Sequence, residues 1–210
     1  MIDATSHIST VRRALTGRTL EAGEAKVSTI SQVYDTGLDE LWEAVTTPER
    51  IARWFAPVSG ELKEGGHYQI EGNASGTVTS CERPRSYAAT WEFGGQTSWI
   101  EVRLTPEGDE RTRFELEHVA HMLDEFWDQY GPGATGVGWE LGLFGLANHL
   151  SDPAAPLDPK AAEAWGLSPA GKAFIRTSAD AWAAAAIEDG DDPAHAREAA
   201  DRTFAFYTGA

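Results

Sequence analysis

The segment Gly136–Leu150 constrains the fold of this 210-residue chain more than any other. Read at 100° per residue, it has two apolar stripes. One stripe holds Trp139, Leu143, Leu146 and Leu150, and the other holds Val137, Leu141 and Phe144. Three glycines, at positions 138, 142 and 145, form a line between the stripes, although each costs a helix interior about 1 kcal/mol relative to alanine. We therefore predict a long helix that lies across a curved sheet and is closely packed on both sides.

Composition and charge narrow the class of protein. The net charge of −16 argues against nucleic acids and anionic membranes as partners, because both require basic surfaces. A single cysteine, Cys81, excludes an internal disulfide. The sequence has no apolar run long enough to span a bilayer, and its N-terminus lacks the pattern of a signal peptide. We therefore expect a cytoplasmic protein.

The first 26 residues are weakly patterned, and we interpret them as an N-terminal arm. The segment Val11–Leu15 is basic within an acidic chain. It can dock an anion or pair with the protein's own carboxylates, and the second interpretation is favoured because charge clusters are mostly solvated or self-paired.

Residues 27–150 read as one α+β domain. A β-branched run at 27–34 predicts a strand, and apolar residues at helical spacing predict a short helix from Leu38 to Val45. Thr47-Pro48 starts a second short helix, which carries Trp54 and Phe55 and is closed by Pro57. Residues 58–119 predict a β-meander with one buried face, followed by a loop at 121–136.

Residues 151–210 are rich in alanine and predict a helical extension packed on the domain. Asp158, Ser168 and Asp192 each precede a proline, which is the pattern of a helix N-cap followed by proline at the first helical position. Glycines at 166, 190 and 209 supply the matching stops. The expected anchors of the three helices are Trp165, Phe174, Ile175, Trp182, Phe204, Phe206 and Tyr207.

The order of elements resembles the START-like superfamily, also called SRPBCC, with its helix-grip (Bet v-like) fold. Thr46–Ala56, the Gly65-Gly-x-Tyr turn, Leu116-x-His118 and Gly138-Trp139 resemble the subfamily of heat-shock-protein-90 ATPase activator homologues. The resemblance covers about residues 27–150. It implies a curved seven-stranded antiparallel sheet, two short helices and a long C-terminal helix, with a cavity for an apolar small molecule between sheet and helix. It implies no universal catalytic residue.

On this fold, one set of side chains faces the predicted cavity. A filled core without ligand and a ligand pocket are equally consistent with such a set, because pockets are mostly apolar with few polar groups. The predicted ligand-binding residues are Trp54, Phe55, Tyr68, Trp91, Phe93, Phe114, Leu116, His118, Trp139 and Leu143, with Ile70 beside them.

His118 is the most reactive side chain of the set. Phe114, Leu116 and His118 alternate with charged residues, so His118 lies on the apolar face of its strand. His121 has the opposite parity and points to the other face, which argues against a metal site formed with His118. A hydrogen-bonded core histidine is favoured over a ligand contact or a general acid–base. Cys81 is expected to be a buried, inert thiol.

Three functions remain open. The first is binding of an apolar or aromatic small molecule, with no cofactor and no metal. The second is an enzyme of the cyclase or dehydratase kind that uses His118 with a tyrosine such as Tyr68. The third is an interaction module that acts on a chaperone ATPase. A homodimer is also left open.

Overall fold

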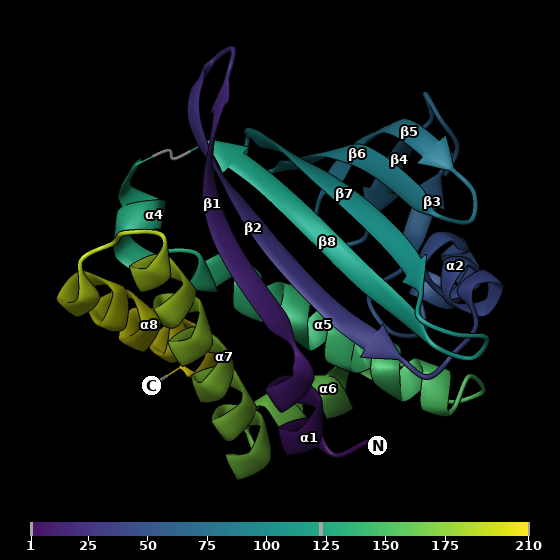
Figure 1. Ribbon diagram of the computed structural model, residues 1–210. Coiled ribbons are helices and arrows are strands. Elements are labelled where there is room, and N and C mark those ends of the chain that lie inside the picture. The colour runs from purple at the N-terminus through teal and green to yellow at the C-terminus, as the bar shows by residue number, and fades with distance from the viewer. Residues whose placement is uncertain (1, 122–123, 210) are drawn as a thin grey trace. The chain divides into compact units, whose positions relative to one another are not determined.

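The computed structural model describes residues 2–121 and 124–209, and these form two compact units (Figure 1). We call residues 31–120 and 145–157 the sheet unit. Residues 2–30, 121–144 and 158–209 form the helical unit, of which residues 122 and 123 lie outside the described residues. Strand β2 and helix α5 each contribute to both units. The two units are described one at a time.

Eight strands form one sheet in the order β1-β2-β8-β7-β6-β5-β4-β3. The predicted α+β helix-grip class is confirmed, with one strand more than the seven expected. The additional strand lies in the predicted arm, where only one of its nine residues, Leu15, is buried, so no alternation marks it in the sequence. The strands are β1 (Arg12–Leu20), β2 (Gly23–Tyr34), β3 (Val58–Gly60), β4 (His67–Ile70), β5 (Ser75–Glu82), β6 (Ser86–Phe93), β7 (Gln96–Pro106) and β8 (Thr112–His121).

Within the sheet unit, β3 to β8 pair in antiparallel order, as the predicted meander requires. Residues directly opposite each other share a face of the sheet. In β8, Phe114, Leu116 and His118 are buried, as are Thr112 and Val119, whereas the charged residues between the first three are partly exposed. The predicted alternation of this strand is therefore confirmed. On the other face, Arg103 forms ion pairs with Glu101, Glu115 and Glu117.

Two short helices follow β2, as predicted. Helix α2 spans Leu38–Thr46, and α3 spans Pro48–Ile51 with proline at its first position. Helix α3 is shorter than expected, because the amides of Arg53 and Trp54 bond to carbonyls three residues back, at Arg50 and Ile51, instead of continuing the α-helical pattern. Trp54 and Phe55 therefore lie in the turn after the helix rather than on it.

The predicted long helix is confirmed as α5, Gly133–Ser151. Its residues from Gly145 onward belong to the sheet unit. A Cβ atom at Gly145 would lie 2.4 Å from the carbonyl oxygen of Trp54, closer than real Cβ atoms come to any heavy atom. The absence of a side chain at this position therefore allows the turn that carries Trp54 to approach the backbone of α5.

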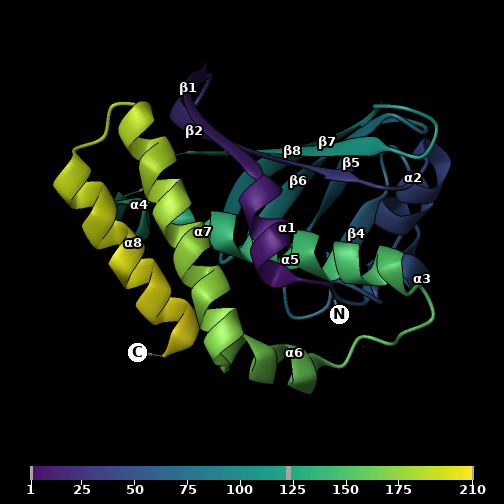
Figure 2. The ribbon, with the colours of Figure 1, turned by 60° about the horizontal axis from the view of Figure 1, so that its bottom comes forward.

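The helical unit contains α1 (Ala4–Thr10), α4 (Asp124–Tyr130), the first half of α5, α6 (Pro159–Leu167), α7 (Pro169–Glu188) and α8 (Pro193–Thr208). Figure 2 shows α7 and α8 side by side. Asp158, Ser168 and Asp192 are N-caps with proline at the next position, so the three predicted starts are confirmed. None of the described helices combines the length and the apolar character needed to cross a bilayer.

Two sequence expectations for the helical unit are wrong. The predicted loop at 121–136 contains α4 and the first turn of α5. Phe206 was expected to be an anchor, but its side chain is 60% exposed. Its neighbours Thr203 and Thr208 are buried instead, so Phe206 lies on the outer side of α8.

A buried ion pair joins β1 to α5 within the helical unit. The guanidinium of Arg13 donates from Nε and one terminal nitrogen to the two carboxylate oxygens of Glu140, each at 2.6 Å. The side chain of Glu140 is 0% exposed. Bidentate geometry is the strongest form of this interaction. For Arg13, the self-paired interpretation of the basic segment is confirmed.

We predict that Gly145→Ala destabilises the protein although alanine favours helices. The new methyl group meets backbone, which cannot rotate away, so overpacking costs about 1–3 kcal/mol. Gly166→Ala in α6 is the matched control, because a Cβ there meets open space and gains up to about 1 kcal/mol. Urea denaturation measures both. Equal effects of the two substitutions would contradict the close approach at Gly145.

We also predict that Arg13→Leu costs about 3–5 kcal/mol of stability, because it leaves a buried carboxylate without its partner. Replacing both residues, as Arg13→Leu with Glu140→Leu, is expected to recover most of that loss, since no buried charge remains. Thermal unfolding of the two single variants and the double variant measures the stabilities needed for a double-mutant cycle. Additive losses would show that the pair is not coupled.

Candidate functional site

The inner face of the sheet, defined here as the face that carries Phe114, Leu116 and His118, is the candidate site. Cross-strand pairing places Leu104, Val102 and Ile100 of β7 opposite these three residues. On β6 the same face continues through Tyr87, Ala89, Trp91 and Phe93. The face is apolar except at a few positions, and these positions decide what it can bind.

A hydrogen-bonded row crosses three strands of the inner face. The Ser98 hydroxyl donates to the carbonyl oxygen of Trp91 (Oγ···O 3.1 Å). The same hydroxyl lies 2.8 Å from Nε2 of His118. A hydroxyl has one proton, so towards His118 the Ser98 oxygen accepts and His118 donates from Nε2.

His118 is neutral in the folded protein. Its side chain is 6% exposed. Burial lowers its pKa to about 4, because a charged imidazolium loses its hydration there. The structure therefore presents a neutral donor–acceptor pair, His118 with Ser98, on an apolar surface. This agrees with the prediction of a hydrogen-bonded histidine on the apolar face.

Tyr68 supplies a second polar group on β4. Its hydroxyl donates to the carbonyl oxygen of Thr90 at 2.6 Å. It reaches β6 by passing over Gly76, where an added Cβ would lie 2.9 Å from the Tyr68 oxygen. Burial and, to a smaller extent, the nearby charge of Glu92 raise the pKa of Tyr68 to about 12. The Tyr68 hydroxyl thus links β4 to β6.

Exposure of the inner face increases along β6 towards the β6–β7 hairpin. Ala89 is buried, Trp91 is half-buried and Phe93 is 59% exposed. All three residues share the face by register, since they pair with Ile100, Ser98 and Gln96. The hydrogen-bonded row therefore lies where the apolar face becomes accessible to solvent.

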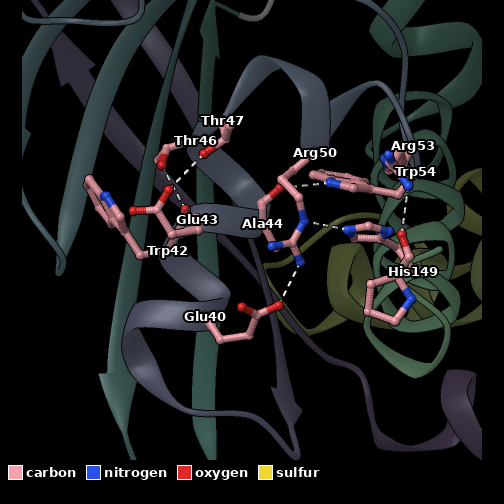
Figure 3. Close-up of polar contacts among 11 residues, drawn as sticks. Glu40, Trp42, Glu43, Ala44, Thr46, Thr47, Arg50, Arg53, Trp54 and His149 are labelled. Atoms are coloured by element: carbon pink, nitrogen blue, oxygen red, sulfur yellow. Dashed lines mark hydrogen bonds and ion pairs between the residues drawn. The ribbon is translucent and has the colours of Figure 1, made fainter.

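Trp54 and Phe55 form a second aromatic group in the sheet unit. Their ring centroids lie 5.6 Å apart. The indole Nε1 of Trp54 donates to the carbonyl oxygen of Ala44 at 2.9 Å, which ties the turn after α3 back to α2 (Figure 3). Trp54 is therefore positioned by a specific hydrogen bond as well as by packing.

The end of α5 holds α3 through a buried histidine. Arg50 donates from Nε to Nε2 of His149 at 2.8 Å and from a terminal nitrogen to Glu40 at 2.6 Å (Figure 3). Burial lowers the pKa of His149, and the neighbouring positive charges of Arg50 and Arg53 lower it further. Because Nε2 accepts, the imidazole proton of His149 is on Nδ1.

The structure brings some of the predicted site residues together. Phe114, Leu116 and His118 share one face, Trp91 is joined to His118 through Ser98, and Tyr68 and Ile70 are buried on β4. Trp139 and Leu143 lie on the half of α5 that belongs to the helical unit, and their role stays a prediction. Ser98 was not singled out from the sequence. Its alternation with Ile100, Val102 and Leu104 is the signal that marks it as a polar residue on an apolar face.

Cys81 is exposed, so the expectation of a buried thiol is wrong. A register shift between Val78 and Ser80 interrupts β5, and every residue from 79 to 82 is exposed beyond it. Alternation alone cannot reveal such a bulge. Across the described residues, no group of three or more histidine, cysteine, aspartate or glutamate side chains is arranged to hold a metal ion.

Residues 35–151, more than half of the chain, match the family model described as activator of Hsp90 ATPase homolog 1-like protein. The chain belongs to this family, in agreement with the resemblance seen in its motifs and with the fold. No curated protein matches the sequence.

Among solved structures, CalU16 from Micromonospora echinospora is similar over nearly its whole length. Its crystal structure has 36% identity and a TM-score of 0.65, covering 83% of this chain and 97% of CalU16. Its solution structure has 38% identity and a TM-score of 0.70, covering 86% and 97%. DynU16, described as a protein of the dynemicin biosynthetic locus, has 22% identity and a TM-score of 0.54, covering 60% and 47%, and shows the fold alone.

We predict that acidification from pH 6.5 to pH 4 destabilises the protein through His118. The unfolded chain binds a proton in this range, whereas the folded protein does not until about pH 4, so stability falls as the pH falls. The slope is about 1.4 kcal/mol per pH unit for one such group. His7, whose pKa is lowered to about 4 by burial and by Arg13, adds a second contribution.

Urea denaturation at several pH values measures this slope. His118→Gln is expected to remove one histidine's share of it, and His7→Gln an equal share. An unchanged slope in His118→Gln would mean that His118 is not held neutral by burial.

Proposed function

We propose that this protein binds an apolar or aromatic small molecule on the inner face of its sheet, with the His118–Ser98 pair as the polar contact. The hydrogen-bonded row from His118 to Trp91 is the observation that supports this most, because it places a neutral polar pair on an apolar surface next to its exposed end. An apolar lining with few placed polar groups is the usual composition of a ligand pocket.

The proposed lining is aromatic. Trp91 and Phe93 border the accessible end of the face, while Trp54 and Phe55 are half-buried in the same unit. Tyr68, Phe114 and Leu116 are buried, and in this proposal they form the floor of the site. We include Trp139 and Leu143 of α5 in the lining because of their sequence pattern. The resemblance to START-like proteins implies an apolar or aromatic ligand.

Binding is favoured over turnover by the state of the two candidate acid–base groups. General acids and bases work best with a pKa near the operating pH. Burial instead moves the pKa of His118 to about 4 and that of Tyr68 to about 12. The Tyr68 hydroxyl is also engaged with Thr90. Both groups are therefore suited to contact a ligand rather than to exchange protons with it.

Titration with 2-naphthol, followed by intrinsic tryptophan fluorescence, tests the proposal. An aromatic ligand stacked beside Trp91 is expected to quench its emission. Trp91→Ala should weaken binding about tenfold, since a buried aromatic contact is worth about 1–2 kcal/mol. Trp127→Ala is the matched control, because Trp127 is a half-buried tryptophan of α4 in the other unit.

His118→Gln separates the polar contact from the apolar surface. We expect a loss of affinity for 2-naphthol but not for naphthalene, which has no hydroxyl to interact with the pair. Circular dichroism must first show that each variant is folded. If neither Trp91 nor His118 affects binding, and native mass spectrometry of gently purified protein reveals no ligand, the inner face is solid core and the interaction-module alternative takes its place.

A further inference from the structure

Aromatic side chains of α4 and α8 form a continuous row on the surface of the helical unit. The ring centroids of Phe126 and Tyr130 lie 5.0 Å apart, those of Tyr130 and Phe206 5.5 Å, and those of Phe206 and Tyr207 5.3 Å. Phe126 is 53% exposed and Phe206 is 60% exposed. Phe126 of α4 and Phe206 of α8 are thus exposed to solvent within the same row of rings. Exposed apolar side chains that gather in this way mark interaction surfaces. We call these four residues the aromatic row.

The aromatic row is held in place by hydrogen bonds between its two helices. Thr203 donates to the carbonyl oxygen of Tyr130 at 3.1 Å, and His195 lies 3.0 Å from the carbonyl oxygen of Asp128. A third bond ties α8 to the start of α5, because the Tyr207 hydroxyl donates to the carbonyl oxygen of Ala134 at 2.6 Å. Figure 1 shows α4 beside α8. A surface held in this way loses little conformational freedom when a partner binds.

A narrow crevice adjoins the aromatic row. Tyr130 belongs to both, and Trp127 forms the aromatic wall of the crevice. Alanines of α7 and α8, including Ala183 and Ala196, also line it. The crevice has room for about one water-sized group, so it suits a methyl group rather than a large side chain. Row and crevice together form an apolar surface with one shallow recess.

The segments around this surface are acidic. By sequence, the turn Glu188–Asp192 has four acidic residues and no basic one. Asp191 of that turn lines the crevice, and Asp128 and Asp192 are exposed. The nearby Arg202 is engaged with the carbonyl oxygen of Gln129 and with Glu198. Charge complementarity therefore favours a positively charged partner.

We propose that the aromatic row and its crevice are a docking site for a basic segment of a partner protein that carries apolar anchors. Its apolar side chains cover Phe126 and Phe206, and its lysines or arginines meet Asp128 and the Glu188–Asp192 turn. Amphipathic helices with one apolar and one basic face have this composition. The site is separate from the inner face of the sheet, so each proposal can be tested without the other.

The test uses a fluorescein-labelled amphipathic peptide of leucine and lysine, with fluorescence anisotropy as the readout on the full chain. Phe206→Ser is expected to weaken binding at least tenfold, because exposed aromatics at the centre of an interface carry much of its affinity. Leu167→Ser, at a similarly exposed position (51%) at the end of α6, is the matched control and should change affinity less than twofold. Raising the salt concentration should weaken binding of the wild-type protein.

Three results would overturn the proposal. The first is equal affinity for a peptide with glutamate in place of lysine, which would exclude charge recognition. The second is an equal effect of Phe206→Ser and Leu167→Ser, which would mean non-specific adsorption to an acidic protein. The third is a dimer in analytical ultracentrifugation that Phe206→Ser dissociates, which would assign the surface to a second copy of the chain.

Discussion

Close packing along α5 is the constraint on which the rest of the structure depends, because this helix contributes residues to both compact units. In the sheet unit, the backbone at Gly145 is approached by the carbonyl of Trp54. In the helical unit, a Cβ at Gly136 would lie 2.2 Å from the ring of Trp182, and one at Gly138 would lie 2.9 Å from the Tyr207 hydroxyl. The cost of glycine in a helix is offset by the contacts that its missing side chain permits.

Two of the buried polar arrangements, one in each unit, differ in charge. Arg13 and Glu140 form a bidentate ion pair, so removing either one leaves the other without its partner in a low-dielectric interior. The pair therefore specifies how β1 meets α5. His118 and Ser98 are neutral, so the second arrangement interrupts the apolar face of the sheet without introducing charge. Such a pair is compatible with an apolar neighbour, whether side chain or ligand.

Periodicity predicted most of the fold because burial follows it closely. The alternation of β8, the caps at Asp158, Ser168 and Asp192, and the stripes of α5 are all visible in the sequence. The missed features have no periodic signal. Strand β1 buries too few residues to alternate, the bulge in β5 shifts the register after Val78, and Phe206 has the composition of an anchor but the orientation of a surface residue. Within the candidate site, His118 follows from parity, whereas its bond to Ser98 depends on cross-strand register, which one sequence does not specify.

The bulge in β5 has a practical consequence for spectroscopy. Because the register shift leaves Cys81 exposed, the single thiol of this protein is open to maleimide or methanethiosulfonate reagents without unfolding. A fluorophore or spin label attached there occupies one defined position on the sheet unit, and no second cysteine has to be mutated first. The wild-type chain is thus ready for distance measurements from β5 to any engineered second label.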